Sequence, residues 1–386
     1  MSQDIRDFVT TSCHLLALGE PTHQEPAFGW VRNELFGQLA ALGFRSIALE
    51  TDRVAALMVN DFVQDGVGTL DAVLREGFSH GWGDLDPNRQ LVAWMREYNE
   101  SRTPEERLAF HGFDAQMENT SAPSPQRYLE YARDYLELDL DLADLAGDDE
   151  RWSRTEAILD PATSIGATAQ AEKLRSVATD LLATLDARGP ELIAATSPAA
   201  WLRARTHLTA GLGLLRYHKQ AAQRLDRAAQ ISGLSAVRDA LMAQNLLDIR
   251  SAEARWGPTL VSAHNLHLHR NQSTWQLPDT VLTWLPAGAI VAPLLGEQYT
   301  FVAGSLGRSE TLGLGDPEPD THEGSLQSLS PTWGLTTATT IASAARKRTD
   351  TTPAQGYFPL DQATLDVTDA ILHISDAAAT TQAACP

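Results

Sequence analysis

The chain has 386 residues, of which 43% are hydrophobic and 21% are charged, as in ordinary soluble globular proteins. Acidic residues outnumber basic ones by 50 to 30, and the formal net charge of −20 disfavours a broad contact with nucleic acid or an anionic membrane. The sequence has no run of about 20 apolar residues, and its first nine residues lack the apolar core of a secretory signal. We therefore expect a cytoplasmic protein with no membrane and no nucleic-acid partner.

Several familiar classes of site lack their sequence signals. The two cysteines, Cys13 and Cys385, lie near opposite ends of the chain, which supports neither a disulfide framework nor a zinc-thiolate site. A Gly-x-Ser-x-Gly elbow is absent, which disfavours the usual serine-hydrolase mechanism. Glycine-rich phosphate loops are also absent, so we exclude ATP and NAD as cofactors.

Four apolar runs are each followed by ionisable residues. Short runs bounded by Gly and Pro are typical of parallel strands that are covered on both faces. The runs are 15–19 before Glu20 and His23, 44–48 before Glu50, 108–113 before Asp114, and 258–263 before His264, Asn265 and His267. Because active sites of parallel sheets lie just beyond the carboxyl ends of the strands, we expect these polar residues to share one cleft.

Amphipathic helices are predicted between these strands. Phe28, Val31, Leu35 and Leu39 are spaced by three and four residues, which is typical of a helix with one buried stripe. Similar spacing predicts helices over 25–42, 52–64, 69–75 and 87–99, and Gly43 occupies the usual position for ending the first one. The alternation predicts an α/β fold with a mainly parallel central sheet flanked by helices.

The middle of the chain has a different pattern. Helical spacing continues from Ser124 to about Arg255 without a convincing strand, which predicts a large helical insertion or cap over the active-site cleft. We therefore expect an α/β core formed by residues 1–123 and 256–386, interrupted by a helical lobe at 124–255. Late strands are expected at 280–285, 299–304 and 370–374. The Gly-, Pro- and Asp-rich stretch 313–331 is expected to be a long surface loop and a candidate lid.

The first candidate for chemistry is the pair Glu20 and His23. A Glu-x-x-His sequence on a strand-to-helix turn places a carboxylate near an imidazole, as a base that takes a proton from water requires. His264 and His267 add two imidazoles that share a helical face or flank one turn. The alternative for His23 is a structural histidine, and the alternatives for His264 and His267 are a supporting hydrogen-bond network or plain solvent exposure.

Glu50 is a second candidate. It follows an apolar run, so its carboxylate is predicted to be buried, which costs free energy unless the charge is paired. An imidazolium or Arg32 would serve as that partner. Arg32 lies on the helix after His23 and is by itself equally compatible with a solvated position.

Six ordered stretches of the chain resemble the erythromycin esterase family. They are Leu-Gly-Glu-Pro-Thr-His at 18–23, Ile-Ala-Leu-Glu at 47–50, Trp-Met-Arg-Glu-Tyr-Asn at 94–99, His-Gly-Phe-Asp at 111–114, Arg-Asp-Ala-Leu-Met-Ala-Gln-Asn at 238–245 and Ala-His-Asn-Leu-His at 263–267. The late Asp-Ala-Ile-Leu-His-Ile at 369–374 is similar to that family's closing strand. The resemblance therefore spans nearly the whole chain.

The resemblance implies an α/β core, a helical lobe over a deep cleft, and hydrolysis of a macrolide lactone ester without a bound cofactor. It also implies roles for six residues: His23 as general base, Glu20 and Glu50 as cleft carboxylates, Arg32 as cleft arginine, and His264 and His267 as the second histidine pair. Two positions depart from the family pattern. Gln24 replaces a small residue and could intrude on the substrate space, and Pro21 replaces another small residue.

Three hypotheses about function remain open from the sequence. The first is a metal-independent esterase or lactonase in antibiotic resistance or natural-product biosynthesis, in which His264 or His267 supports the oxyanion. The second uses the same site for a non-hydrolytic step, such as intramolecular acyl transfer or cyclisation. The third is a metal- or haem-binding protein built on His23, His264 and His267. In the first two, the partner is a small apolar ester, lactone or polyketide.

Overall fold

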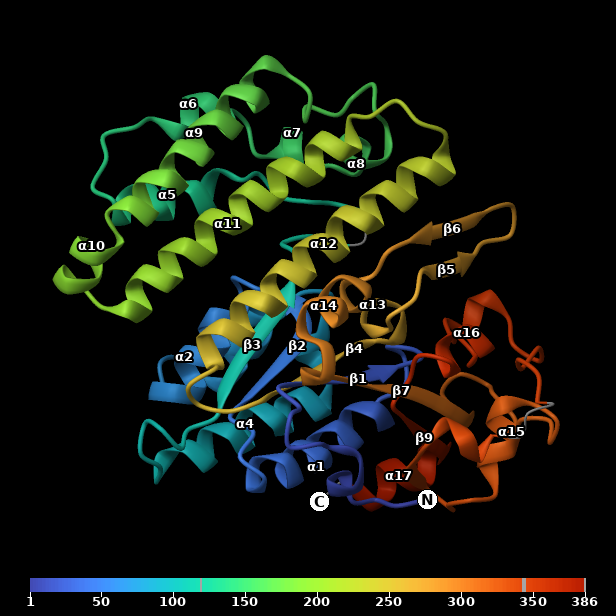
Figure 1. Cartoon of the computed structure of the whole chain (residues 1–386). Helices are drawn as coiled ribbons and strands as arrows, with labels where there is room; N and C mark the ends of the chain where they lie inside the picture. Colours follow the sequence, from blue (N-terminus) through green and yellow to red (C-terminus); the bar gives the residue numbers. More distant parts are fainter. Residues whose placement is uncertain (119, 342–344, 385–386) are drawn as a thin grey trace.

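The structure is a computed structural model that describes residues 1–118, 120–341 and 345–384 (Figure 1). Its centre is a seven-stranded sheet in the order β3-β2-β4-β1-β7-β9-β8. The strands are β1 (Leu15–Glu20), β2 (Ser46–Asp52), β3 (Ala109–Asp114), β4 (Thr259–His264), β7 (Tyr299–Arg308), β8 (Trp333–Thr336) and β9 (Ala370–Asp376). Neighbouring strands are parallel except for β8, which pairs antiparallel with β9. The predicted α/β fold with a mainly parallel sheet is confirmed.

Helices cover both faces of the sheet, because side chains of each strand alternate between the two faces. Leu16 and Leu18 of β1 belong to the core that includes helices of the first hundred residues, whereas Leu15 and Ala17 belong to the core on the other face. The first group of helices comprises α1 (Ala27–Ala41), α2 (Ala56–Asp65), α3 (Leu70–Gly77) and α4 (Asp86–Glu100), with α17 (Ala377–Ala384) beside α1. The second face packs against α12 (Arg227–Glu253) and α14 (Ala287–Leu295).

Helices fill the chain between β3 and β4, drawn in green and yellow in Figure 1. They are α5 (Gln126–Tyr135), α6 (Leu142–Ala146), α7 (Glu150–Ser153), α8 (Thr155–Leu159), α9 (Ala169–Ala187), α10 (Gly189–Ala195), α11 (Pro198–Ala221) and α12. Most of them surround a hydrophobic core of their own that contains Trp152, Leu174 and Leu208. The division into 1–123, 124–255 and 256–386, with the middle part as a cap, stays a prediction.

The remaining elements lie in the last third of the chain. A hairpin of β5 (Ser273–Gln276) and β6 (Val281–Trp284) projects from the core, and its second strand lies against α12. Short helices are α13 (Asn265–Leu268), α15 (His322–Gln327) and α16 (Gln362–Leu365). Single 3-10 turns are η1 (Ile5–Phe8), η2 (Trp82–Asp84), η3 (Gly296–Gln298), η4 (Ala338–Thr340) and η5 (Pro353–Gln355). Within the described residues, no helix is long and apolar enough to cross a membrane.

The segment 313–331 differs from the expected free surface loop. It contains α15, which packs against β7 and β9 and carries the buried Glu323. Glu323 Oε1 accepts hydrogen bonds from the Tyr357 hydroxyl at 2.9 Å and from the Leu360 backbone N–H at 2.8 Å, which ties this helix to the chain that follows it. The prediction of a loop was therefore wrong over α15, because these partners lie more than 30 residues away in sequence.

The second strand also extends further than predicted. Glu50 lies inside β2, and the helix after it begins at Ala56 instead of Asp52. An irregularity in the pairing of β2 with β3 falls between Leu49 and Asp52. The Asp52 carboxylate then accepts hydrogen bonds from the backbone N–H groups of Val54 and Ala55, which favours a turn before the helix. Helical spacing alone did not reveal this turn.

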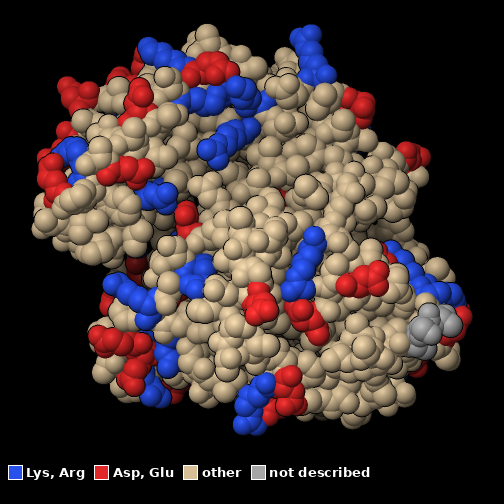
Figure 2. Space-filling view, viewed as in Figure 1, with Lys and Arg blue, Asp and Glu red and all other residues tan. Residues whose placement is uncertain are grey.

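Acidic and basic side chains are interspersed over the face of the molecule seen in Figure 2. Elsewhere in the structure and on this face alike, short-range ion pairs are common among the described residues; two of them are Arg133 with Asp134 and Arg188 with Glu191. That face therefore presents no continuous basic area, of the kind that binds a phosphate backbone.

Candidate active site

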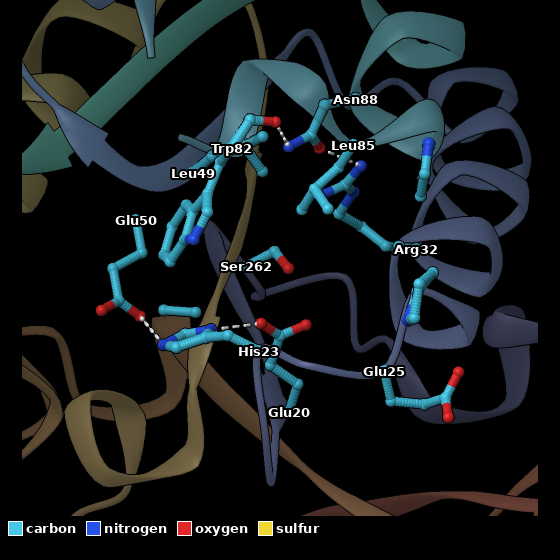
Figure 3. Close-up of a pocket in the computed structure, with 14 residues that line it drawn as sticks. Glu20, His23, Glu25, Arg32, Leu49, Glu50, Trp82, Leu85, Asn88 and Ser262 are labelled. Atoms are coloured by element: carbon cyan, nitrogen blue, oxygen red, sulfur yellow. Dashed lines mark hydrogen bonds and ion pairs between the residues drawn. The ribbon is translucent and has the colours of Figure 1, made fainter. Parts of the chain in front are cut away.

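The carboxyl ends of three neighbouring strands bring the candidate residues together. β4 lies between β2 and β1, and Glu20 of β1 is opposite His264 of β4 in the register. Glu50 comes from β2, and His23 follows β1 directly (Figure 3). Glu20, His23, Glu50, His264 and, one helical turn later, His267 therefore meet at one edge of the sheet.

His23 lies between two carboxylates. Its Nδ1 is 2.6 Å from Glu20 Oε1, and its Nε2 is 3.6 Å from Glu50 Oε2. Burial alone would lower the pKa of His23, but the charges of Glu50 and Glu20 outweigh it and raise the pKa to about 10. The ring also lies 4.7 Å from the Trp82 ring, centroid to centroid. At neutral pH the resting form of His23 is therefore an imidazolium that is held on both edges.

Glu50 lies at the centre of the site, and its side chain is only 2% exposed. Its Oε1 lies 3.1 Å from Arg238 Nη2 and 3.3 Å from His267 Nε2, and its Oε2 accepts the His264 backbone N–H at 2.8 Å. Burial would raise the pKa of this carboxyl, but the positive charges of His267 and His23 hold it well below its usual range. One buried carboxylate thus binds three cationic side chains.

His267 is engaged through both ring nitrogens. Its Nδ1 lies 2.9 Å from Asp239 Oδ1, and its Nε2 faces Glu50. Asp239 in turn accepts the Trp284 indole N–H at 2.7 Å and the Ala287 backbone N–H at 2.8 Å. Burial would lower the pKa of His267, but Asp239 and Glu50 raise it to about 10. This histidine is a charged structural support for Glu50, without a free ring nitrogen.

His264 differs from His267 in its hydrogen-bond partners and in its charge. Its Nδ1 accepts the Leu266 backbone N–H at 3.1 Å, which places the ring proton on Nε2. Burial and the nearby charge of His23 hold the pKa of His264 well below its ordinary value, so the ring is neutral. Among the described residues, His264 Nε2 has no hydrogen-bond partner, although it is buried. Its ring centroid lies 5.2 Å from that of His23.

Arg238 is a site residue that we did not single out from the sequence. It lies on α12, and besides Glu50 it contacts Asp114 at 2.9 Å through Nε and at 2.5 Å through Nη2. Asp114 also lies 3.2 Å from His80 Nε2. Burial would raise the pKa of Asp114, but Arg238 and His80 lower it to about 2. The sequence did contain a hint of this role. The family-like stretch at 238–245 opens with the charged pair Arg238 and Asp239, within a largely apolar helix.

Arg32 does not pair with Glu50. Its Nε and Nη2 donate to Asn33 Oδ1 at 3.1 and 2.8 Å, and Nη2 also donates to Asn88 Oδ1 at 2.9 Å. The side chain is 7% exposed, and burial lowers the pKa of its guanidinium to about 10 although Glu20 acts in the opposite sense. Of the two partners considered for Glu50, the imidazolium is present and Arg32 is replaced by Arg238.

Two cavities adjoin this cluster, and His23, Glu50 and Trp82 line both. The larger has a volume of about 510 Å³, and its further lining residues are Gln24, His80, Ser235, Arg238, His264, Leu266, His267, Trp275, Trp284 and Phe358. The smaller has about 40 Å³, and its further lining residues are Glu20, Glu25, Pro26, Gly29, Arg32, Leu49, Leu85, Pro87, Asn88, Ser262 and Ala263. Gln24 is thus part of the wall of the larger cavity. The stretch 313–331, which was a candidate lid, contributes no lining residue to the larger cavity. Phe358, which lies further along the chain, does line it.

The His and Glu side chains of the cluster engage one another instead of converging on a metal position. Within the described residues, no group of three or more His, Cys, Asp and Glu side chains has a geometry that could hold a metal ion. The nitrogens of His23 and His267 point at carboxylates, and the Nδ1 of His264 accepts a backbone N–H. The site is therefore built from hydrogen bonds and ion pairs between protein groups.

Comparison with solved structures shows the same fold in other proteins. A Bacillus cereus protein is similar over 96% of this chain and 90% of its own, with a TM-score of 0.68 and 14% identity. A succinoglycan biosynthesis protein has a TM-score of 0.65 and 18% identity, covering 95% of this chain and 88% of its own. A mutant of erythromycin esterase EreC in its open conformation has a TM-score of 0.65 and 19% identity, covering 95% and 91%.

The sequence comparisons are more specific. No curated protein has a significant match to the chain. The family model described as erythromycin esterase matches residues 39–377, which include Glu50, Arg238 and the histidine pair of β4 and α13. Because the match covers most of the chain and the fold agrees with that of a solved member, this chain belongs to the erythromycin esterase family.

Proposed function

We propose that the chain is a carboxylic ester hydrolase that cleaves an ester or lactone with water activated by His23, without a bound cofactor. One observation carries the proposal: a histidine held between two carboxylates lines the same cavity as a neutral histidine whose buried Nε2 has no hydrogen-bond partner among the described residues. A base and an oxyanion donor in one cavity are the minimum equipment for hydrolysis of an acyl group.

His23 acts as the general base in this proposal. Glu20 anchors Nδ1–H at 2.6 Å, so Nε2 is the nitrogen that exchanges a proton. The ring accepts a proton from water while the water oxygen bonds to the acyl carbon. Glu20 and Glu50 stabilise the resulting imidazolium, which makes the neutral ring a strong base. The same raised pKa means that this neutral ring is scarce near pH 7.

His264 supplies the oxyanion donor. A neutral imidazole whose Nε2 has no hydrogen-bond partner of normal geometry among the described residues can donate to the carbonyl oxygen as negative charge develops there. His267 was an equal candidate from the sequence, but both of its nitrogens are engaged by carboxylates. We therefore assign His267, with Arg238, the role of positioning Glu50.

The proton that His23 holds then completes the reaction. When the tetrahedral intermediate collapses, the bond between the acyl carbon and the alkoxy oxygen breaks, and the alkoxide takes the proton from His23 Nε2. The products are a carboxylic acid and an alcohol, or a hydroxy acid from a lactone. His23 returns to its neutral form, ready for the next water molecule.

The larger cavity indicates the kind of ester. Its volume of about 510 Å³ falls in the range of roughly 300–1,000 Å³ for small-molecule sites. Trp82, Trp275, Trp284 and Phe358 add apolar surface to a wall that is otherwise mostly polar, and this mixture suits an apolar ester, lactone or polyketide that carries polar groups. Because a solved relative is an erythromycin esterase, a macrolide lactone is the first substrate to test.

The test is turnover of a panel of lactones and aryl esters in ¹⁸O-labelled water. We expect the acid product to carry one labelled oxygen, and His23→Ala to abolish its formation. An unlabelled cyclised product that also depends on His23 would replace hydrolysis with intramolecular acyl transfer. Turnover that survives His23→Ala would contradict both hydrolysis and acyl transfer by His23.

A further inference from the structure

The smaller cavity lies beside the catalytic histidine and has no role in the mechanism so far. We call it the Arg32 chamber; Figure 3 shows Arg32, Asn88, Ser262, Glu20 and His23 around it. It shares the wall of His23, Glu50 and Trp82 with the larger cavity, whereas His264 lines only the larger one. A ligand in the chamber would therefore contact His23 without contacting His264.

Arg32 lines this chamber with a guanidinium group, only part of whose N–H donors are engaged by other residues. The side chain is 93% buried, yet no carboxylate among the described residues lies within ion-pair distance of it. Its bonds to Asn33 and Asn88 use Nε and Nη2, which leaves the two N–H groups of Nη1 for a ligand. A buried guanidinium needs hydrogen-bond acceptors, so an occupant with a free oxygen is favoured.

Size and charge restrict that occupant. A volume of about 40 Å³ has room for about three water molecules, since each needs roughly 10–15 Å³. The walls carry three carboxylates, Glu20, Glu25 and Glu50, against two cations, Arg32 and His23, so a further anion is not favoured. A small neutral molecule that both donates and accepts hydrogen bonds fits these walls.

We propose that the Arg32 chamber holds the water that attacks the ester, and that Arg32 positions this water by donating to its oxygen. The inference rests on the proposed hydrolase function. The ester would lie in the larger cavity with its carbonyl oxygen at His264 Nε2, and water would reach the acyl carbon past His23. Leu85 and Leu49 are among its lining residues, and its volume of about 40 Å³ is too small for most alcohols.

Competition between water and added alcohols tests this assignment. An alcohol that replaces water attacks the acyl carbon and yields a new ester plus the original alcohol. For the wild-type enzyme, we expect methanol to form some methyl ester and 1-propanol to form almost none at equal concentration. Leu85→Ala should enlarge the chamber and raise the fraction of propyl ester several-fold. Leu70→Ala, at a half-buried leucine outside both cavities, is the matched control and should leave the fraction unchanged.

Variants of Arg32 test the positioning role separately. Because the ester binds on the other side of His23, Arg32→Met should lower kcat at least tenfold while KM for the ester stays within about twofold. Arg32→Lys keeps a cationic donor and should recover part of kcat. A rise in KM with unchanged kcat would overturn the proposal, because Arg32 would then bind the ester itself.

The outcomes separate this inference from the proposed function. If wild-type enzyme hydrolyses esters but transfers the acyl group to 1-propanol as readily as to methanol, the chamber is not the source of the nucleophile. If no ester or lactone in the panel is hydrolysed, the proposed function fails first. The wild-type alcohol series needs no variant, so a poorly folded Leu85→Ala protein would not prevent the decision.

Discussion

Two histidine clusters in this molecule have opposite characters. At the carboxyl ends of β1, β2 and β4, His23 lies between two carboxylates and borders two cavities. Between β7 and β9, His373 Nδ1 lies 2.9 Å from Ser305 Oγ and its Nε2 lies 3.2 Å from Gln327 Oε1. Both Ser305 and His373 are fully buried, and neither lines the cavities around His23.

The difference shows what makes a buried histidine chemically useful. Burial lowers the pKa of His373 to about 3, the charge of Arg348 acts in the same direction, and the hydrogen-bond partners of the ring are a hydroxyl and an amide. The Ser305–His373 pair has the spacing of a nucleophile and base, but substrate has no space to reach it. At His23 the carboxylates supply basicity and the cavities supply access. Burial by itself supplies neither.

The largest expected effect comes from removing the base. His23→Ala should lower kcat/KM by roughly 10²- to 10⁴-fold, the usual worth of a positioned general base. His207→Ala is a matched control, because His207 stacks on Tyr131 in the helical region and should leave activity intact. Steady-state kinetics with circular dichroism would check both. Full activity in His23→Ala would show that His23, like His373, has only a structural role.

His264 should matter nearly as much, through its free N–H. In His264→Asn the amide reaches only the position of the ring Nδ1, so the donor at Nε2 is lost and kcat should fall by about 10²- to 10³-fold. In His264→Gln the amide reaches the Nε2 position and should restore part of the activity. Equal losses in the two variants would contradict a donor role.

The pH dependence distinguishes the two clusters in one experiment. The pKa of His23 is raised to about 10 from an ordinary value of 6.5, and only its neutral form is a base, so kcat/KM should rise about tenfold per pH unit up to about pH 10. Stability should change in the opposite direction. The charged forms of His23 and His267 stabilise the fold fully below about pH 6.5, and this contribution is lost as pH rises through about 10.

Measured pH–rate profiles and thermal unfolding from pH 6 to 10 would check both trends. Replacing His373, which is neutral throughout this range, should leave the shape of both curves unaltered. A profile that is flat above pH 7 would mean that His23 is not the titrating base.

The smallest expected effect concerns the buried serine. Ser305→Ala removes a partner of His373 and should lower the free energy of unfolding by about 1–3 kcal/mol, the cost of a buried group left unpaired. Its kcat should stay within about twofold of wild type. Ser153→Ala, which removes only an exposed hydrogen bond, should change stability by less than about 0.5 kcal/mol. Loss of activity in Ser305→Ala at full stability would make Ser305 a nucleophile after all.

Local sequence was sufficient to predict several parts of this protein. Apolar runs bounded by glycine and proline located β1, β3 and β4, and helical spacing located α1 and α4, because burial on one or both faces imposes a period on the chain. The placement of Glu20, His23 and His264 at strand ends followed from the same reasoning, since parallel strands align their carboxyl ends. The family-like stretches allowed the family itself to be recognised.

Tertiary structure decided how these residues are used. Arg238 reaches Glu50 across 188 positions of sequence, whereas Arg32, which is much nearer in the chain, does not pair with it. His264 and His267 are only three residues apart, but burial and the charge of His23 keep the first neutral, whereas Asp239 and Glu50 keep the second charged. Side-chain direction, burial and the nearest charge set a histidine's proton affinity, and these depend on elements that meet only when the chain folds.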